Sequence, residues 1–379
     1  MTEFSAARQL AHAAGLAAPG SPESVSLAHA VGRTLATAVT ATAPLPGFDA
    51  SAMDGWAVAG DGPWMPGSPI AAGDDIPPQR LAPGAARPIS TGAPLPPGAA
   101  RVIRSERGEL RDGLLHETMA DAGRHIREAG EESAAGEVLV AQGARLTPPR
   151  VALAAAAGYD RVDVVAAVTA QLLVLGDEVI ASGHPVPGRV RDVFSPSLPA
   201  VLDALGTQPP ILARVGDSLA ETTAALAAAP AGLLVTTGGS ARGPADHVRA
   251  SLAALGAEVL LDGVRMRPGH PLLLARLGGT LVLCLPGNPL AAYVGLVAIG
   301  GALVDGMLGR PLAPLTEISL VESVPGAPST RVVPVSLGVP TAHQGAGMLR
   351  GLAEADALAI IPPGGALAGD RVEILPLPW

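Results

Sequence analysis

Two glycine turns decide the fold of this chain: Thr236-Thr237-Gly238-Gly239-Ser240-Ala241-Arg242-Gly243-Pro244-Ala245-Asp246 and Leu285-Pro286-Gly287-Asn288-Pro289. Each turn follows an apolar run typical of a buried strand and precedes a segment typical of a helix. Glycine lets backbone N–H groups approach an anion, and the start of a helix adds a partial positive charge. Because two such turns from one sheet line a single crevice at the carboxyl ends of the strands, the sequence predicts a site for a phosphate-bearing or oxyanionic ligand.

The surrounding segment, Val168 to Val304, alternates strands and helices, which predicts a doubly wound α/β domain with a mostly parallel sheet. The predicted strands are Gln171–Leu175, Ile211–Val215, Gly232–Thr236, Val259–Leu261, Leu272–Leu277 and Leu281–Leu285. The predicted helices are Ser197–Leu205, Ser218–Ala228, Asp246–Leu255 and Pro289–Val304.

The remainder of the chain predicts three further domains. Helices are expected at Ser5–Ala18, Ser24–Thr40 and Thr147–Ala157, whereas Pro44 to Gly143 and Pro311 to Trp379 consist of short strands and turns rich in proline and glycine. The predicted division is an N-terminal helical linker domain (1–45 with 140–166), a β-rich domain (46–139), the α/β domain (167–309) and a small, barrel-like all-β domain (310–379).

Composition excludes several functional classes. The net charge is −9, and no Lys/Arg cluster with interleaved aromatic residues occurs, so a nucleic-acid partner is not expected. The lone Cys284 lies in an apolar run, which indicates a buried structural thiol rather than a disulfide or a nucleophile. The N-terminus lacks a secretory signal and the longest apolar stretch, Tyr293–Val304, is too short to cross a bilayer, so a cytoplasmic protein without membrane contact is expected.

Acidic residues follow several of the predicted strands. Asp177 and Glu178 follow one strand, Asp217 follows another, and Asp246 follows the first glycine turn. Strand ends on one edge of a sheet converge, and carboxylates beside an anion site would hold a hard cation such as Mg²⁺. The alternative is that Asp217 and Asp246 only cap helices.

Two other groups of polar residues are candidates for binding. Arg265, Arg267 and His270 surround a rigid Pro-Gly turn and could reach an oxyanion; alternatively, the arginines are solvated. Asp54 lies in an unusual cluster, Pro44 to Val58, and a second cluster of similar character contains Thr91. Either cluster could instead be a rigid turn that orders a loop.

These clusters, in this order, resemble the molybdopterin molybdotransferase family of MoeA-type enzymes and the gephyrin E-domain. The family pattern PxFDxSAMDGYA reads PGFDASAMDGWA from Pro46, TGAxLPxGAD reads TGAPLPPGAA from Thr91, and GDEL reads GDEV from Gly176. GGxSxGxxD reads GGSARGPAD from Gly238, KPGKP reads RPGHP from Arg267, and LPGNPxxA is intact from Leu285. The resemblance runs from about Pro44 to Ala292.

The resemblance implies an elongated homodimer of four-domain subunits that inserts molybdate into adenylylated molybdopterin, releases AMP and requires Mg²⁺. It implies catalytic roles for Asp54, Thr91, Glu178, Asp217 and Asp246, with Asp217 and Asp246 as metal ligands. It implies substrate-binding roles for Gly238, Gly239, Ser240, Arg267, His270, Pro286, Gly287, Asn288 and Pro289. Other proteins of molybdenum cofactor biosynthesis are possible partners.

The departures from the family pattern concern the oxyanion site. Arg267 and His270 replace two lysines, and Ala241 stands where the pattern has a serine, with Ser240 one place earlier. Ala346 and Gly351 replace both serines of the pattern GxQxSGxLxSxAxAN. Two alternatives therefore stay open: a catalytically impaired paralogue that binds molybdopterin or acts as a scaffold, and an adenylyltransferase, whose α/β domain the first turn also resembles.

Overall fold

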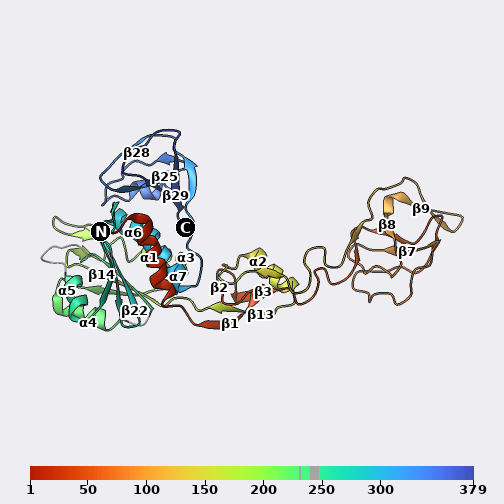
Figure 1. Ribbon diagram of the computed structural model, residues 1–379, viewed down its shortest axis with the longest axis horizontal. Coiled ribbons are helices and arrows are strands. Elements are labelled where there is room, and N and C mark those ends of the chain that lie inside the picture. The colour runs from red at the N-terminus through yellow and green to blue at the C-terminus, as the bar shows by residue number, and fades with distance from the viewer. Residues whose placement is uncertain (230–231, 240–246) are drawn as a thin grey trace.

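The computed structural model describes residues 1–229, 232–239 and 247–379. Figure 1 shows an elongated molecule in which the α/β domain and the C-terminal domain form a body at one end. A small linker domain follows, and a β-rich domain lies at the far end. We call the linker and β-rich domains together, residues 22–165, the arm. The chain starts in the body with α1 (Phe4–Leu16), runs out along the arm and returns.

A six-stranded sheet forms the centre of the α/β domain. Its order is β17 (Ile211–Val215), β14 (Ala170–Leu175), β18 (Gly232–Thr237), β22 (Thr280–Leu285), β21 (Leu273–Leu277), β19 (Glu258–Asp262). The first four strands are parallel, whereas β21 and β19 pair in an antiparallel manner. The predicted α/β fold is confirmed, with an antiparallel edge, and the carboxyl ends of four strands meet at one edge.

Helices cover both faces of this sheet. The larger core lies beneath α1, α3 (Leu198–Leu205) and one continuous helix made of α6 (Pro289–Gly295), a π-helical turn (Leu296–Gly300) and α7 (Gly301–Met307). The opposite face is covered by α4 (Leu219–Ala227) and α5 (His247–Ala254). Within the described residues, Pro289–Met307 is the one helix long and apolar enough to cross a membrane, and 94% of it is buried. It is the central core helix of the domain.

The linker domain corrects one sequence-based expectation. The segment Ser24–Thr40, predicted as a helix, instead contributes β1 (Pro22–Ser26), a 3₁₀ turn at Leu27–His29, β2 (Thr34–Leu35) and β3 (Val39–Thr40). β1 and β2 flank β13 (Arg161–Val165), β3 pairs with β12 (Val138–Val140), and α2 (Pro148–Ala156) completes the domain. The helix prediction is wrong because pairing with a distant strand overrides local periodicity, and because Gly32 takes φ +85°, which ends any helix.

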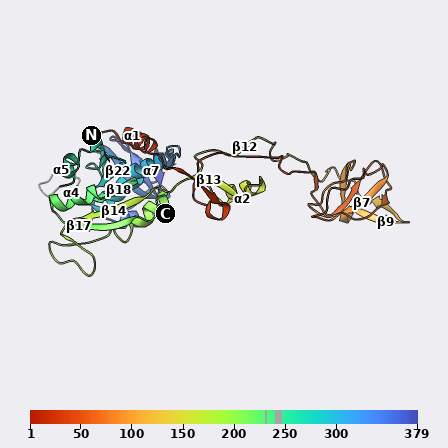
Figure 2. The same ribbon diagram turned by 90° about the horizontal axis from the view of Figure 1, so that it is seen from below.

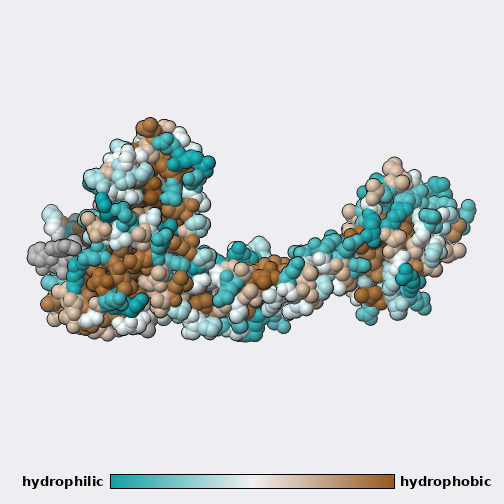
Figure 3. All heavy atoms as spheres, in the orientation of Figure 1, coloured by the Kyte–Doolittle hydropathy of each residue, from teal (hydrophilic) through white to brown (hydrophobic). Residues whose placement is uncertain are grey.

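The β-rich domain contains a four-stranded sheet in the order β6 (Met65–Pro66), β7 (Ala85–Ile89), β5 (Gly55–Val58), β8 (Arg101–Arg104). A hairpin of β9 (Gly108–Arg111) and β10 (Leu114–Glu117) and a short pair of β4 (Ala50–Ser51) and β11 (Ile126–Arg127) complete it. Figure 3 shows a narrow neck between this domain and the linker domain. The two chain segments of the neck are bridged at Leu45 and Ser133.

The C-terminal domain is built on a sheet in the order β20 (Met266–Arg267), β25 (Thr330–Ser336), β27 (Ala357–Ile361), β29 (Arg371–Pro376), β23 (Thr316–Ser319). β26 (Val339–Pro340) pairs with β25, β24 (Val324–Pro325) pairs with β28 (Gly365–Ala366), and α8 (Arg350–Ala353) is the one short helix of this domain. β20 comes from the segment that the sequence assigned to the α/β domain. Its parallel pairing with β25 therefore joins the two domains.

Candidate active site

Both glycine turns lie together at the carboxyl edge of the α/β sheet. The Gly238 N–H donates to the carbonyl of Leu285 at 3.0 Å, and the Gly176 N–H donates to the carbonyl of Val215 at 3.2 Å. A Cβ atom added at Gly287 would lie 3.6 Å from the Cα atom of Gly238. Four loops therefore converge at one edge of the sheet, which is where parallel α/β sheets form a crevice for ligands.

Asp217 lies in this crevice and does not cap the helix that follows it. The N-cap of α4 is Ser218, whose Oγ accepts the N–H of Glu221 at 3.2 Å. One carboxylate oxygen of Asp217 accepts the N–H of Asp177 at 3.1 Å, which ties the end of β17 to the turn after β14. The capping alternative for Asp217 is therefore wrong, and its exposed carboxylate faces the same crevice edge as the Asp177–Glu178 turn.

The predicted metal ligands are only partly described. Ser240 and Asp246 lie outside the described residues, and elsewhere in the described chain no group of three or more His, Cys, Asp or Glu is arranged to hold a metal. The chemistry of Asp217 nevertheless fits Mg²⁺, because an exposed carboxylate is the kind of ligand this ion takes. Glu178 is likewise exposed, in the turn that leads to β15 (Val179–Ile180) and, further on, β16 (Val190–Arg191).

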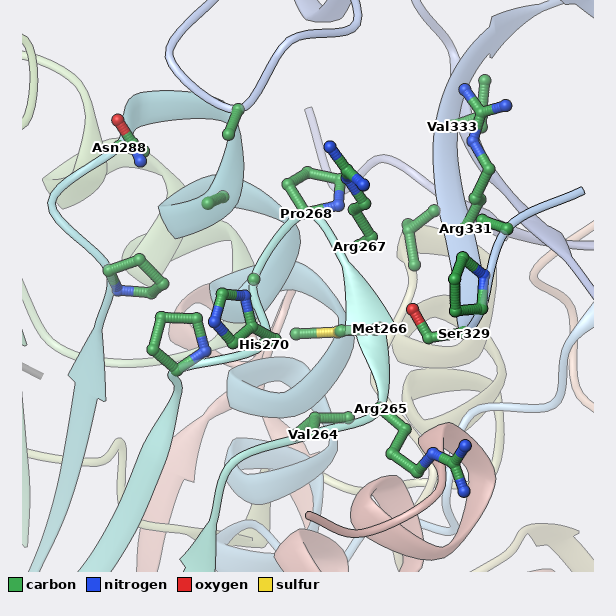
Figure 4. Close-up of a pocket in the computed structure, with 18 of the residues that line it drawn as sticks. Val264, Arg265, Met266, Arg267, Pro268, His270, Asn288, Ser329, Arg331 and Val333 are labelled. Carbon is green, nitrogen blue, oxygen red and sulfur yellow. The ribbon is translucent and has the colours of Figure 1, made fainter. Parts of the chain in front are cut away.

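A pocket of about 1050 Å³ opens beside the crevice, between the α/β and C-terminal domains. Arg267 and His270 line it from one domain and Arg331 lines it from the other (Figure 4). Arg267 and Arg331 are direct neighbours in the parallel pairing of β20 with β25, and Figure 4 shows both side chains extending to the same side. Like charges on adjacent strands repel unless an anion lies between them.

Within the described residues, no carboxylate pairs with Arg267 or Arg331. Among its described lining residues there is no Asp or Glu. Arg331 donates to the carbonyl of Pro325 at 2.9 Å and to Oε1 of Gln344 at 3.1 Å, both neutral acceptors. Arg265 also lines the pocket, but it pairs with Glu3 at 2.9 Å and points away from Arg267 in Figure 4. The pocket suits an oxyanion.

Arg331 and Gln344 were missed by the sequence analysis. Arg331 lies in the region Pro311 to Trp379, for which the sequence predicts short strands and turns, and no local pattern shows that its strand pairs with β20. Arg331 is recognised as part of the site only in the structure, where it lies beside Arg267 although the two residues are far apart in the sequence.

The backbone N–H groups at the start of α6 are less available to a ligand than the sequence predicts. The N–H of Ala291 donates to the carbonyl of Ala346 at 3.2 Å, so a loop of the C-terminal domain satisfies part of this helix terminus. Asn288, the N-cap, makes no capping hydrogen bond through its side chain and is exposed at the pocket with Pro286 beside it. Gly287 and Pro289 complete the turn. The pocket is therefore lined by the side chains of this turn rather than by a free row of N–H groups.

Asp54 and Thr91 lie together, but in the β-rich domain. The Thr91 N–H donates to Oδ1 of Asp54 at 2.7 Å, and both side chains are exposed. The Gly92 N–H donates to the carbonyl of Ser51 at 2.8 Å, so the two sequence clusters form one structural unit. Figures 1 and 2 show this domain at the opposite end of the molecule from the α/β sheet. One chain thus does not bring Asp54 to Asp217.

A group of charges supports the Asp54 loop from behind. The Asp121 carboxylate lies 2.9 Å from both Arg104 and His125. The close contact with His125, assisted by Arg107 and Arg104, lowers the pKa of Asp121 to about 2. The carbonyl of His125 accepts the N–H of Ala52, two residues before Asp54. Asp121 thereby helps fix the loop.

Cys284 is buried as predicted. Burial raises the pKa of its thiol to about 12, so no thiolate forms near neutral pH.

Comparison with protein families divides the chain into three matched regions. The MoeA N-terminal region (domain I and II) matches residues 2–158, the probable molybdopterin binding domain matches residues 171–304, and the MoeA C-terminal region (domain IV) matches residues 320–377.

Curated relatives match over nearly their whole length. Molybdopterin molybdenumtransferase 2 of Mycobacterium tuberculosis is 33% identical, over 90% of this chain and 91% of the relative. Molybdopterin molybdenumtransferase of Synechococcus elongatus is 32% identical over 98% of both chains. The crystal structure of a molybdopterin biosynthesis MoeA protein from Pyrococcus horikoshii superposes with a TM-score of 0.78 at 25% identity, covering 100% of this chain and 99% of that one. The chain therefore belongs to the MoeA family of molybdopterin molybdenumtransferases.

Proposed function

We propose that this protein is a molybdopterin molybdotransferase, which inserts molybdate into adenylylated molybdopterin and releases AMP during molybdenum cofactor biosynthesis. The observation that carries the proposal is the pair Arg267 and Arg331, side by side in a pocket without a carboxylate among its described lining residues. Two adjacent guanidinium groups suit a tetrahedral oxyanion such as molybdate. The crevice at the sheet edge, next to this pocket, would take the phosphates of the second substrate.

We propose the following roles for the remaining residues. Gly238, Gly239 and Gly287 would let the backbone approach the pterin phosphate, and His270 and Asn288 would bound the oxyanion. Mg²⁺, held by Asp217 with Asp246 and substrate oxygens, would neutralise charge on the phosphoanhydride that is cleaved. Glu178, at the same edge, would contribute to orienting this phosphoanhydride.

We further propose a homodimer in which the arm of one subunit reaches the body of the other. The support is the separation of Asp54 and Thr91 from Asp217 within one chain. A closed twofold dimer would bring each exposed Asp54–Thr91 unit to the partner's crevice. We also predict that this protein is cytoplasmic and that it binds other proteins of molybdenum cofactor biosynthesis.

The two alternatives of the sequence analysis are not favoured. An adenylyltransferase would need only the α/β domain, whereas the MoeA-specific regions match residues 2–158 and 320–377 as well. A scaffold would not need two adjacent arginines at the pocket.

The experiment that tests the function measures AMP release from adenylylated molybdopterin on addition of molybdate. Arg331→Met should lower kcat/KM for molybdate by about 10- to 100-fold, because a hydrogen bond to a charged group contributes about 1.5–3 kcal/mol. Arg350→Met is the matched control, since Arg350 is 72% exposed and lies in the same domain.

A parent protein that releases no AMP, and that fails to restore nitrate reductase activity to a strain lacking the insertase, would overturn the proposal. Equal turnover by parent, Arg331→Met and Arg350→Met would instead remove Arg331 from the site.

A further inference from the structure

Arg310 lies where the arm meets the α/β domain. It follows α7 and precedes the C-terminal domain in the chain. Its Nε donates to Oγ1 of Thr34 in the arm at 2.7 Å. Its Nη1 donates to the carbonyl of Leu205 in the α/β domain at 2.9 Å and lies 3.6 Å from the carboxylate of Asp305. One guanidinium therefore bonds across the joint between arm and body.

This contact is buried and charged. The side chain of Arg310 is 12% exposed and that of Asp305 is 19% exposed. Burial lowers the pKa of Arg310 and raises the pKa of Asp305, while their mutual attraction opposes both shifts. His12, which bonds the carbonyl of Arg310 at 2.8 Å, and Arg8 also face Asp305 from α1. A buried ion pair tolerates little change of geometry, because each charge left without its partners is costly.

Glycine residues close the joint around Arg310. A Cβ atom at Gly143, in the arm, would lie 2.7 Å from the carbonyl oxygen of Gly309. A Cβ atom at Gly206 would lie 2.9 Å from Nη2 of Arg310. The Gly20 N–H, where the chain leaves the body, donates to the carbonyl of Met307 at 2.9 Å. The backbones of arm and body lie close together at Gly143 and Gly309, so rotation of the arm would disturb this contact and the Arg310–Thr34 hydrogen bond.

We propose that Arg310 and Thr34 are positioning residues that fix the angle of the arm and thereby place Asp54 and Thr91 against the partner subunit's crevice. The inference rests on the proposed function. Asp54 lies at the far end of the arm, so a small rotation at Arg310 becomes a large displacement at Asp54 (Figure 1). A misplacement of about 1 Å in a catalytic group can cost about 100-fold in rate.

The test compares Thr34→Val with Thr34→Ser. Valine keeps the shape of threonine but removes the acceptor for Arg310, whereas serine keeps the hydroxyl. Thr34→Val should lower kcat for AMP release by about 10-fold or more, and Thr34→Ser should retain parental kcat. Molybdate affinity by calorimetry should stay within about 2-fold in both, because Arg267 and Arg331 belong to the body.

A second measurement reports the arm directly. Cys284 is the single cysteine and is buried, so spin labels can be attached at Asp61→Cys in the arm and Ala253→Cys in the body, both exposed positions. In dimers with one labelled subunit, Thr34→Val should broaden or shift the distance distribution, and Thr34→Ser should not.

Parental kcat in Thr34→Val, measured below its melting temperature, would overturn the inference, as would an unchanged label distance. Absence of AMP release in the parent would instead count against the proposed function, so the two failures are distinguishable.

Discussion

Gly351 and Ala346 are the two positions where this chain lacks the serines of the family pattern. The structure shows that the two positions differ in the room they leave for a side chain. A Cβ atom at Gly351 would clash with the carbonyl oxygen of Ala342 and would lie 2.8 Å from Oγ1 of Thr341. Ala346 already carries a Cβ atom at the pocket wall. Gly351 is therefore required by the close approach of the Thr341–Ala342 backbone.

Restoring the two serines should affect the free energy of unfolding differently. Gly351→Ser should lower the free energy of unfolding by about 1–3 kcal/mol, the usual cost of forcing atoms into a packed site. Ala346→Ser should change it by less than about 0.5 kcal/mol and add a donor at the pocket. Denaturant titration and molybdate calorimetry on both variants check this. Equal stability of the two variants would show that the Thr341–Ala342 loop moves to accept the larger side chain in Gly351→Ser.

The sequence predicts those parts of the candidate site whose residues lie next to one another in the chain. The glycine turns and Asp217 can be recognised because a strand end and a turn are consecutive in sequence. Arg331 cannot, because its relation to Arg267 depends on a strand pairing between domains. Sequence likewise left capping open for Asp217, and only the Ser218 hydrogen bond decides it.

At the scale of elements, the contact between α1 and α7 depends on two glycines. A Cβ atom at Gly306 would clash with the carbonyl oxygen of His12 and would lie 2.9 Å from the N atom of Leu16. A Cβ atom at Gly15 would clash with the carbonyl oxygen of Leu303. The helix backbones touch, which holds the N-terminal helix on the body.

Gly306→Ala should therefore destabilise the protein, by about 1–3 kcal/mol or more. Gly301→Ala, in the same helix, is the matched control: its nearest atom would be 3.5 Å away, an ordinary contact. There alanine should be neutral or stabilising by up to about 1 kcal/mol through helix propensity. Thermal melting checks both, and a control that melts as early as Gly306→Ala would refute the packing argument.

Most elements of the α/β domain follow from periodicity, because the central strands β14, β18 and β22 are continuous apolar runs and the helices between them have apolar faces. The elements of the linker domain do not follow from periodicity. β1 and β2 are stabilised by pairing with β13, which follows the whole β-rich domain in the sequence. Long-range pairing of short strands leaves little trace in local sequence.

At the scale of the whole molecule, the arm separates the predicted catalytic residues. Asp54→Asn and Asp217→Asn homodimers should each be inactive. Co-expressed, they should recover about a quarter of parental AMP release, because half of randomly formed dimers are mixed and each mixed dimer has one intact site of two. Light scattering must first give two subunit masses. Recovery near zero from a verified mixture would show that Asp54 and Asp217 act within one subunit.

The position of strand β20 determines whether the C-terminal domain can be removed or exchanged on its own. By sequence it belongs with residues before the C-terminal domain, yet by hydrogen bonding it is the edge strand of that domain's sheet. A chain shortened at residue 310 would leave β20 with no partner and would remove half of the arginine pair. The C-terminal domain is thus no interchangeable module: inheritance, exchange or deletion of it alters the ligand pocket and the α/β domain together.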